Sequence, residues 1–225
     1  MKLAKTLLAS AVAAAAISAT AQAEISTNIA VASDYVWRGV TQTGYGAAVS
    51  GGIDYSNESG FFAGTWLSNT AFGSNEMDLY LGFGGEAGDF GYSVTYNYYT
   101  YPTIEDANFG EILLDFSFQF LSAGLSYTAN SDVEEPGIFV EGDLHYYVGA
   151  SFDLGEGWSI GGTYGFYDFD YDGDAAVGDV SYGYLQLDLG KSLDDWGDIA
   201  VSLSAADEES GEDDPIVWVS WSKGF

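Results

Sequence analysis

The chain ends with the stretch Pro215-Ile216-Val217-Trp218-Val219-Ser220-Trp221-Ser222-Lys223-Gly224-Phe225. In an extended strand, successive side chains point to opposite faces. Counting back from Phe225, the residues on one face are therefore mostly apolar: Lys223, Trp221, Val219 and Val217. This predicted strand fits two architectures, the wall of a membrane barrel or the buried last strand of a soluble sandwich. The rest of the chain must decide between them.

The first residues predict export. Lys2 and Lys5 precede a short apolar run, and the small-residue site Ala21-Gln22-Ala23 follows it. A charged start, a short apolar stretch and an A-x-A site are typical of a secretory signal peptide. The apolar run is shorter than the ~20 residues that cross a bilayer as a helix, which disfavours a retained anchor. We therefore predict that residues 1–23 are a cleaved signal peptide and that residues 24–225 form one domain.

The charge balance is strongly acidic. The sequence contains 5 Lys and Arg residues against 34 Asp and Glu residues. Without Lys2 and Lys5, the cations number 5 − 2 = 3 and the net charge is near 3 − 34 = −31. Such a field repels nucleic acid and attracts cations, so nucleic acid is excluded as a partner. The three remaining cations are Arg38, Lys191 and Lys223.

Composition also limits the chemistry. The chain has no cysteine, which excludes disulfides, thiol nucleophiles and thiolate metal sites. It is 16% aromatic and contains 30 glycines, unlike a disordered acidic tail. Charged and apolar side chains must therefore be separated on different faces of a folded structure.

Strict alternation of apolar and polar residues dominates the predicted mature chain. In one segment, for example, Leu79 and Leu81 alternate with Asp78 and Tyr80. This pattern predicts twelve strands, at residues 25–37, 48–56, 61–68, 77–84, 90–101, 111–120, 121–128, 143–153, 158–167, 182–191, 198–205 and 216–225.

The connections favour a membrane barrel. Short turns follow the even-numbered strands and long loops follow the odd-numbered ones. An even strand count with this alternation is typical of an all-β, antiparallel, up-and-down transmembrane β-barrel with both termini in the periplasm. A soluble ligand-binding barrel would point its apolar face inward. Here the small and polar face carries Asp54, Asp78, Asp115 and Asp188, which suits a wet lumen.

The closing stretch resembles the last strand of bacterial outer-membrane β-barrels. That resemblance implies that Phe225 is an assembly signal recognised by the barrel assembly machinery. Lys223 departs from the usual apolar residue at its position, but near the membrane rim a lysine can extend its ammonium into water.

Several other stretches carry a family resemblance: Ser33-Asp34-Tyr35-Val36-Trp37-Arg38-Gly39-Val40-Thr41-Gln42, Gly51-Gly52-Ile53-Asp54-Tyr55, Glu58-Ser59-Gly60-Phe61-Phe62-Ala63-Gly64-Thr65-Trp66, Asp78-Leu79-Tyr80, Asp89-Phe90-Gly91-Tyr92 and Ser222-Lys223-Gly224-Phe225. They resemble the TorF-type family of proteobacterial porins, whose solute is not settled. The resemblance implies a bacterial outer-membrane barrel but does not assign a function. For such a barrel we expect outer-membrane lipid, lipopolysaccharide and small hydrophilic solutes as partners.

Polar-face residues are the candidates for lining a pore. As the one arginine of the predicted mature chain, Arg38 is either a constriction charge or an ion-pair partner of Asp34 or Asp54. The tyrosines are either stacking surfaces for flat solutes or fillers of a narrow lumen. The predicted pore-lining set is Asp34, Arg38, Asp54, Asp78, Tyr80, Asn97, Tyr99, Asp115, His145, Tyr147, Tyr184 and Asp188.

One acidic stretch resembles the first half of a calcium loop. Asp168, Asp170 and Asp172 alternate before Gly173, and Asp179 follows at a later ligand position. The last ligand is Asp rather than Glu, and the flanking elements are strands, so a solvated acidic loop is the favoured interpretation. No other cofactor is expected. The acidic loops together could collect divalent cations that bridge to lipopolysaccharide.

Catalysis is not expected. His145 is the sole histidine and lies close to Asp143, with Ser126 and Ser151 as conceivable partners. A hydrolase would need one of these serines in contact with an oriented histidine, and neither lies in a nucleophile-elbow motif. The sequence instead predicts a channel for small hydrophilic solutes, preferentially cationic or neutral. The alternative is a non-conducting structural or surface-binding barrel whose acidic loops bind divalent cations or a partner.

Overall fold

The computed structural model describes residues 23–134, 136–171, 180–212 and 214–225. The signal-peptide prediction for residues 1–23 falls almost entirely outside this range, and so do Asp172 and Asp179 of the predicted calcium loop. Among the described residues, no helix is long and apolar enough to cross a membrane. Their helical elements are two short 3₁₀ turns, η1 (Asp194–Trp196) and η2 (Glu208–Ser210).

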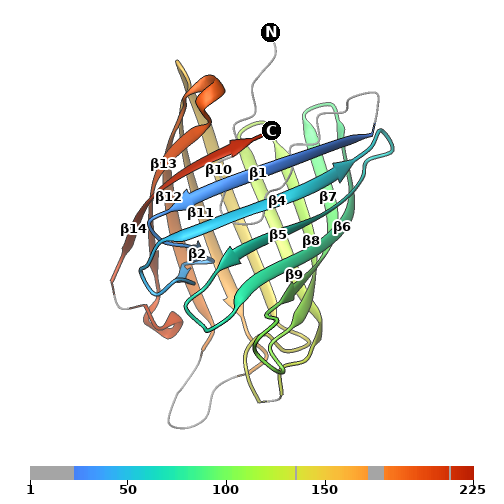
Figure 1. Ribbon diagram of the computed structural model, residues 1–225, viewed down its shortest axis with the longest axis vertical. Helices are drawn as coiled ribbons and strands as arrows, with labels where there is room; N and C mark the ends of the chain where they lie inside the picture. The colour runs from blue at the N-terminus through green and yellow to red at the C-terminus, as the bar shows by residue number, and fades with distance from the viewer. Residues whose placement is uncertain (1–22, 135, 172–179, 213) are drawn as a thin grey trace.

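The protein is a closed antiparallel β-barrel (Figure 1). Every strand pairs with its neighbour, and β1 closes the wall against β14 with Val31 opposite Trp221. The prediction of an all-β barrel of about twelve strands is confirmed. The barrel strands are β1 (Glu24–Ala32), β4 (Ala48–Ser56), β5 (Phe61–Asn69), β6 (Asn75–Ala87), β7 (Phe90–Thr100), β8 (Phe109–Phe118), β9 (Leu121–Ser131), β10 (Leu144–Gly155), β11 (Trp158–Asp168), β12 (Tyr182–Ser192), β13 (Asp198–Ala206) and β14 (Ile216–Gly224).

The barrel is apolar outside and polar inside. On β6, Leu81 is 53% exposed, whereas Asp78, which points to the other face, is 5% exposed. The same alternation runs through the neighbouring strands, so the outer wall is a continuous apolar surface. A monomeric protein in water rarely exposes such a surface, whereas a barrel in lipid requires it.

The two ends of the barrel differ. In Figure 1 the short turns and the C-terminus lie at the upper end, and the long connections lie at the lower end. Thr27 and Phe225 exchange backbone hydrogen bonds of 3.1 and 2.8 Å, which holds the C-terminus beside the beginning of β1. We call these two ends the short-turn end and the long-loop end.

The prediction that one strand covers residues 25–37 is wrong for the second half of that range. β1 ends at Ala32, and the chain then forms a separate two-stranded hairpin from β2 (Val36–Trp37) and β3 (Val40–Thr41). Asp34 stabilises the change of direction by accepting hydrogen bonds from the Thr41 and Thr43 hydroxyls, at 2.6 and 2.7 Å. A strand that continues and a strand that folds back show the same alternation, so periodicity alone could not separate them.

Candidate functional site

The hairpin of β2 and β3 has an arginine at its tip. Trp37 pairs with Val40, and Arg38 and Gly39 form the two-residue turn between them, with φ angles of +48° and +91°. Two-residue hairpin turns of type I′ need a positive φ at both positions. Glycine meets this requirement without cost, but arginine does not, so contacts around Arg38 must hold the turn in place.

Gly39 lies directly against the barrel wall. A Cβ atom at this position would be 2.8 Å from the Cβ atom of Tyr184 on β12. We expect Gly39→Ala to destabilise the barrel by about 1–3 kcal/mol, because the substitution adds a steric clash to the strained φ. Urea unfolding in lipid vesicles measures the change. The matched control is Gly73→Ala, which has a φ of +89° and nothing within 4 Å. Equal effects of the two substitutions would contradict the close packing of the hairpin tip.

The Arg38 guanidinium makes a two-point ion pair with Glu111 on β8. Its Nη1 and Nη2 atoms donate to Oε1 and Oε2 of Glu111, each at 2.7 Å, and Nη2 also donates to Ser126 Oγ at 3.2 Å. The side chains are 7% and 1% exposed, respectively. Trp37 and Tyr167 lie over the guanidinium, with ring centroids 4.3 and 4.8 Å from Cζ. This geometry holds arginine specifically, because lysine has no planar fork to match a carboxylate.

Glu111 is also the acceptor for two wall tyrosines. Tyr99 donates to Oε2 at 3.1 Å and Tyr167 donates to Oε1 at 3.2 Å. With the two bonds from Arg38, the buried carboxylate therefore accepts four hydrogen bonds. A buried charge is stable only when it is paired and hydrogen-bonded, and Glu111 meets both conditions.

The contact between Arg38 and Glu111 crosses the inside of the barrel. The hairpin connects β1 to β4, whereas Glu111 is on β8 and Ser126 is on β9. In the closed strand order, β9 is six positions from β1 in either direction, which makes it the opposite wall. The Tyr182 hydroxyl on β12 donates to the Arg38 carbonyl at 3.0 Å. The hairpin therefore spans the lumen rather than lining one side of it.

Aromatic side chains surround the hairpin tip. Trp37 packs against Tyr99, Tyr167 and Phe139, with ring centroids 5.7, 6.1 and 5.9 Å away. Phe139 belongs to the long connection before β10 and stacks on Phe109 of β8 at 5.0 Å. Aromatic rings from the hairpin, the wall and a loop thus interlock across the long-loop end.

Two glutamates anchor the rest of the segment between β1 and β4. Glu76 on β6 accepts hydrogen bonds from the Tyr35 and Tyr101 hydroxyls, both at 2.7 Å. Glu212, in the last long connection, accepts the Thr41 backbone N–H at 3.0 Å and also bonds the Tyr45 hydroxyl. The inserted segment, residues 33–47, is therefore held from both sides.

The predicted pore-lining residues divide into two groups inside the barrel. Toward the long-loop end, beside the hairpin, are the buried residues Asp34, Arg38, Asp78, Asn97, Tyr99, His145 and Tyr184. Toward the short-turn end are the half-buried residues Asp54, Tyr80, Asp115, Tyr147 and Asp188.

Carboxylates in the second group are bonded to neighbouring wall residues. The Tyr80 hydroxyl bonds Asp54, and the Tyr147 hydroxyl donates to Asp115 at 2.9 Å. Ser117, two residues beyond Asp115 on the same face, is exposed. The interior is thus filled at the long-loop end and accessible to solvent nearer the short-turn end. That these residues line a conducting pore stays a prediction.

The residues considered for catalysis belong to separate contacts. His145 Nε2 lies 3.0 Å from the Tyr184 hydroxyl, whereas Ser126 contacts Arg38. Asp143 accepts the backbone N–H groups of Val140 and Asp170, so it joins two long connections.

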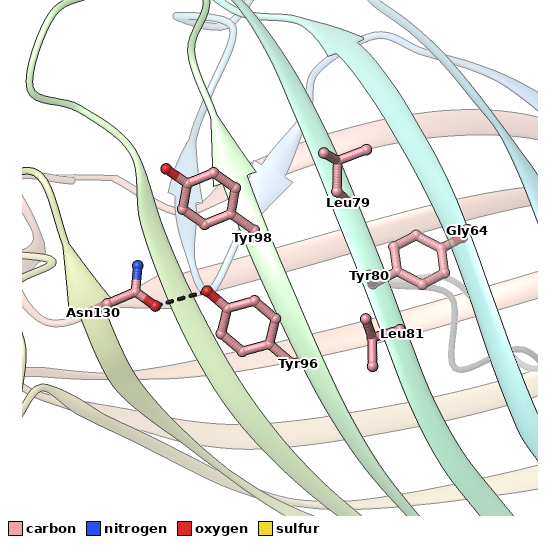
Figure 2. Close-up of a pocket in the computed structure, with 7 residues that line it drawn as sticks. All are labelled: Gly64, Leu79, Tyr80, Leu81, Tyr96, Tyr98 and Asn130. Atoms are coloured by element: carbon pink, nitrogen blue, oxygen red, sulfur yellow. Dashed lines mark hydrogen bonds between the residues drawn. The ribbon is translucent and has the colours of Figure 1, made fainter.

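A shallow groove lies on the outer wall, away from this interior site (Figure 2). Leu79 and Leu81 are outward-facing residues of β6 that line it, and the Tyr96 hydroxyl donates to Asn130 Oδ1 at 2.7 Å beside them. Lipid would cover this surface in a membrane, so the groove is not a candidate path for solutes. The remaining lining residues are Gly64, Tyr80 and Tyr98.

The expected partner of Arg38 was wrong. The sequence suggested Asp34 or Asp54, but the structure pairs Arg38 with Glu111. Glu111 is in phase with Asp115, and Glu76 is in phase with Asp78, so alternation could have placed both glutamates inside. No local pattern indicated the inward position of Trp37, which depends on the hairpin.

The closed antiparallel wall and its apolar outer face define a transmembrane β-barrel. The structure is similar to the KdgM porin, with a TM-score of 0.58 and 9% identity over 89% of this chain and 98% of that one. It is also similar to the NanC porin, with a TM-score of 0.54 and 9% identity over 89% and 98% of the two chains. At this identity the likeness shows the fold alone.

The chain belongs to the family described as "Bacterial protein of unknown function (Gcw_chp)", whose model matches residues 16–213. A search of curated proteins found no match.

Proposed function

We propose that the protein is an outer-membrane channel for small hydrophilic solutes that are cationic or neutral. The observation that carries the proposal is the charge inside the barrel. Arg38 is neutralised by Glu111, while Lys191 and Lys223 lie on strand positions that face outward. Among the residues that the structure describes, these interior carboxylates have no cationic partner: Asp34, Asp54, Glu76, Asp78, Asp115 and Asp188. A lumen of this kind attracts cations and repels anions.

This proposal sets the protein apart from one of its structural neighbours. The KdgM porin has been solved in complex with disordered oligogalacturonate. Each galacturonate unit carries a carboxylate, and an acidic interior would repel such a chain. The shared fold therefore supports a channel, whereas the interior charge argues for a different class of solute.

The proposal includes the place of the barrel in the cell. With the beginning of β1 and the C-terminus at the short-turn end, the up-and-down topology is consistent with periplasmic ends of the mature chain and with long loops at the cell surface. Phe225 is then available to the assembly machinery, and the acidic loops face lipopolysaccharide. The closer relationship to TorF-type porins is part of the same proposal.

Ion selectivity tests the proposed function. In planar bilayers under a KCl gradient, we expect a cation-over-anion permeability ratio of about 3 or more, because lumen carboxylates set the sign of the passing ion. The triple variant Asp54→Asn, Asp115→Asn and Asp188→Asn should bring the ratio close to one while keeping side-chain size. Anion preference in the wild-type protein would contradict the proposal.

A second candidate function is a non-conducting structural or surface-binding barrel. The interlocked rings of Trp37, Tyr99, Tyr167 and Phe139 favour it, because they fill the lumen at the long-loop end. Binding of divalent cations by the acidic loops, with Asp168 and Asp170 among the candidates, would accompany this function. A folded barrel with no conductance, either whole or with the hairpin removed, would favour it over the channel.

A further inference from the structure

Two of the three cations of the predicted mature chain lie on the outer wall at the short-turn end. Lys191 on β12 is opposite Trp158 on β11 and Ile199 on β13, and Ile199 is opposite Trp221 on β14. These four residues form one row across four strands, which we call the rim row. Since neighbouring strands lie about 4.8 Å apart, the rim row is roughly 14 Å long. Lys223 lies two residues beyond Trp221 on the same face.

Both ammonium groups are held in place by a backbone carbonyl and an aromatic ring. Lys191 Nζ donates to the Glu156 carbonyl and lies 5.3 Å from the Trp158 ring centroid. Lys223 Nζ donates to the Asp195 carbonyl at 2.7 Å and lies 5.1 Å from the Phe225 ring centroid. Within the part of the chain that the structure describes, neither lysine has a carboxylate oxygen within ion-pair distance. An ammonium has three donors, so each lysine keeps two for an external acceptor.

The surface next to the lysines changes along the barrel axis. Toward the middle of the wall, the next outward row is Leu189, Val201 and Val219, which are paired in register and 42–53% exposed. Toward the short-turn end, the turns beyond the lysines carry Glu156, Asp194 and Asp195, all exposed. From membrane to water, the order is therefore apolar side chains, ammonium groups and carboxylates.

We propose that the rim row and Lys223 bind a phospholipid whose headgroup carries a primary ammonium beyond its phosphate, as phosphatidylethanolamine does. The acyl chains lie along the apolar row, the phosphate accepts hydrogen bonds from Lys191 and Lys223, and the headgroup ammonium faces the carboxylates of the turns. Each part of the lipid thus meets a group of complementary character. The indole rings at the ends of the rim row suit the same interfacial depth.

Two other phospholipids match this surface less well. Phosphatidylglycerol has a phosphate but no cation, so its headgroup would meet the carboxylates of Glu156, Asp194 and Asp195 without compensation. Phosphatidylcholine has a cation without an N–H donor, so it cannot hydrogen-bond to them. The carboxylates therefore supply selectivity, and the lysines supply affinity for phosphate.

Native mass spectrometry of the folded barrel with equal amounts of the three lipids tests the proposal. We expect the wild-type protein to retain phosphatidylethanolamine at least about fivefold over the other two, since its headgroup alone makes charge-assisted contacts with both the lysines and the carboxylates. The variant Lys191→Gln/Lys223→Gln should lose most of this retention. Phe120→Ala, which changes an exposed aromatic at another short turn, is the control and should retain the lipid.

A second variant separates the contribution of the carboxylates, which is selectivity, from that of the lysines, which is affinity for phosphate. Glu156→Gln/Asp194→Asn/Asp195→Asn should still bind phospholipid but should no longer prefer phosphatidylethanolamine to phosphatidylglycerol. Circular dichroism and heat-dependent gel migration establish that each variant is folded. Equal retention by the wild-type and double-lysine proteins would overturn the site, and a wild-type preference for phosphatidylglycerol would overturn its selectivity. Channel conductance does not enter this test, so its outcome is independent of the proposed function.

Discussion

Replacing residues 33–47 by a two-residue Asn-Gly turn is expected to raise single-channel conductance at least about threefold, because the segment crosses the lumen and its side chains fill the long-loop end. The design leaves the wall intact, since Ala32 and Ala48 are direct cross-strand partners on β1 and β4. An Asn-Gly turn suits two adjacent antiparallel strands. Removing the segment takes Trp37 and Arg38 out of the interior and leaves Glu111 free to face water.

The control shortens a different long connection in the same way. Asn69 and Asn75 are cross-strand partners on β5 and β6, so residues 70–74 can also be replaced by Asn-Gly without a change of register. This variant should conduct like the wild-type protein, because the connection that it shortens does not carry the hairpin. If both variants conduct equally, the hairpin is not the constriction. If neither conducts although both are folded, the non-conducting barrel is the better description.

Breaking the pair of Arg38 and Glu111 is expected to cost about 3–5 kcal/mol of unfolding free energy, because each single substitution leaves a buried charge without its partner. In Arg38→Met, Glu111 loses the guanidinium and keeps the hydroxyls of Tyr99 and Tyr167 as donors. In Glu111→Gln, the guanidinium faces an amide with one acceptor oxygen in place of a carboxylate. Urea unfolding in lipid vesicles, followed by tryptophan fluorescence, measures both effects.

The double variant Arg38→Met/Glu111→Gln tests whether the loss of stability in the single variants comes from an unpaired buried charge. With both charges removed, no unpaired ion remains, so the loss should be smaller than the sum of the single losses by about 2 kcal/mol or more. Arg38→Lys is the conservative control, and it should fall between wild type and Arg38→Met because lysine keeps the charge without the fork. Single losses below about 1 kcal/mol, the range of an exposed ion pair, would mean that the pair does not hold the hairpin.

Much of the wall could be predicted from the sequence because membrane barrels obey two strict rules. Every backbone group must find a partner, so the strands must close on themselves. Side chains alternate between lipid and lumen, so Leu79 and Asp78 had to lie on opposite faces. Together these rules led to the strand number, the direction of each face and the polar interior.

The interior site was harder to predict because its contacts connect distant parts of the chain. Val36 and Trp37 continue the alternation of β1, and nothing in their spacing shows that the chain leaves the wall after Ala32. Asp34 and Asp54 were the expected partners because alternation places their carboxylates on the same lumen face as Arg38. Glu111 was in phase with the lumen-facing residues, but its role depends on a hairpin that was not foreseen.

From its sequence alone, this protein could be assigned a barrel fold, the two faces of its regular wall strands and an acidic interior. These properties follow from local alternation, which is a feature of neighbouring residues. The entry of residues 33–47 into the lumen and the pairing of Arg38 with Glu111 on the opposite wall became evident from the three-dimensional structure. The physical reason is that a period of two assigns a side chain to a face, whereas a contact across the lumen depends on barrel closure and on the path of a loop.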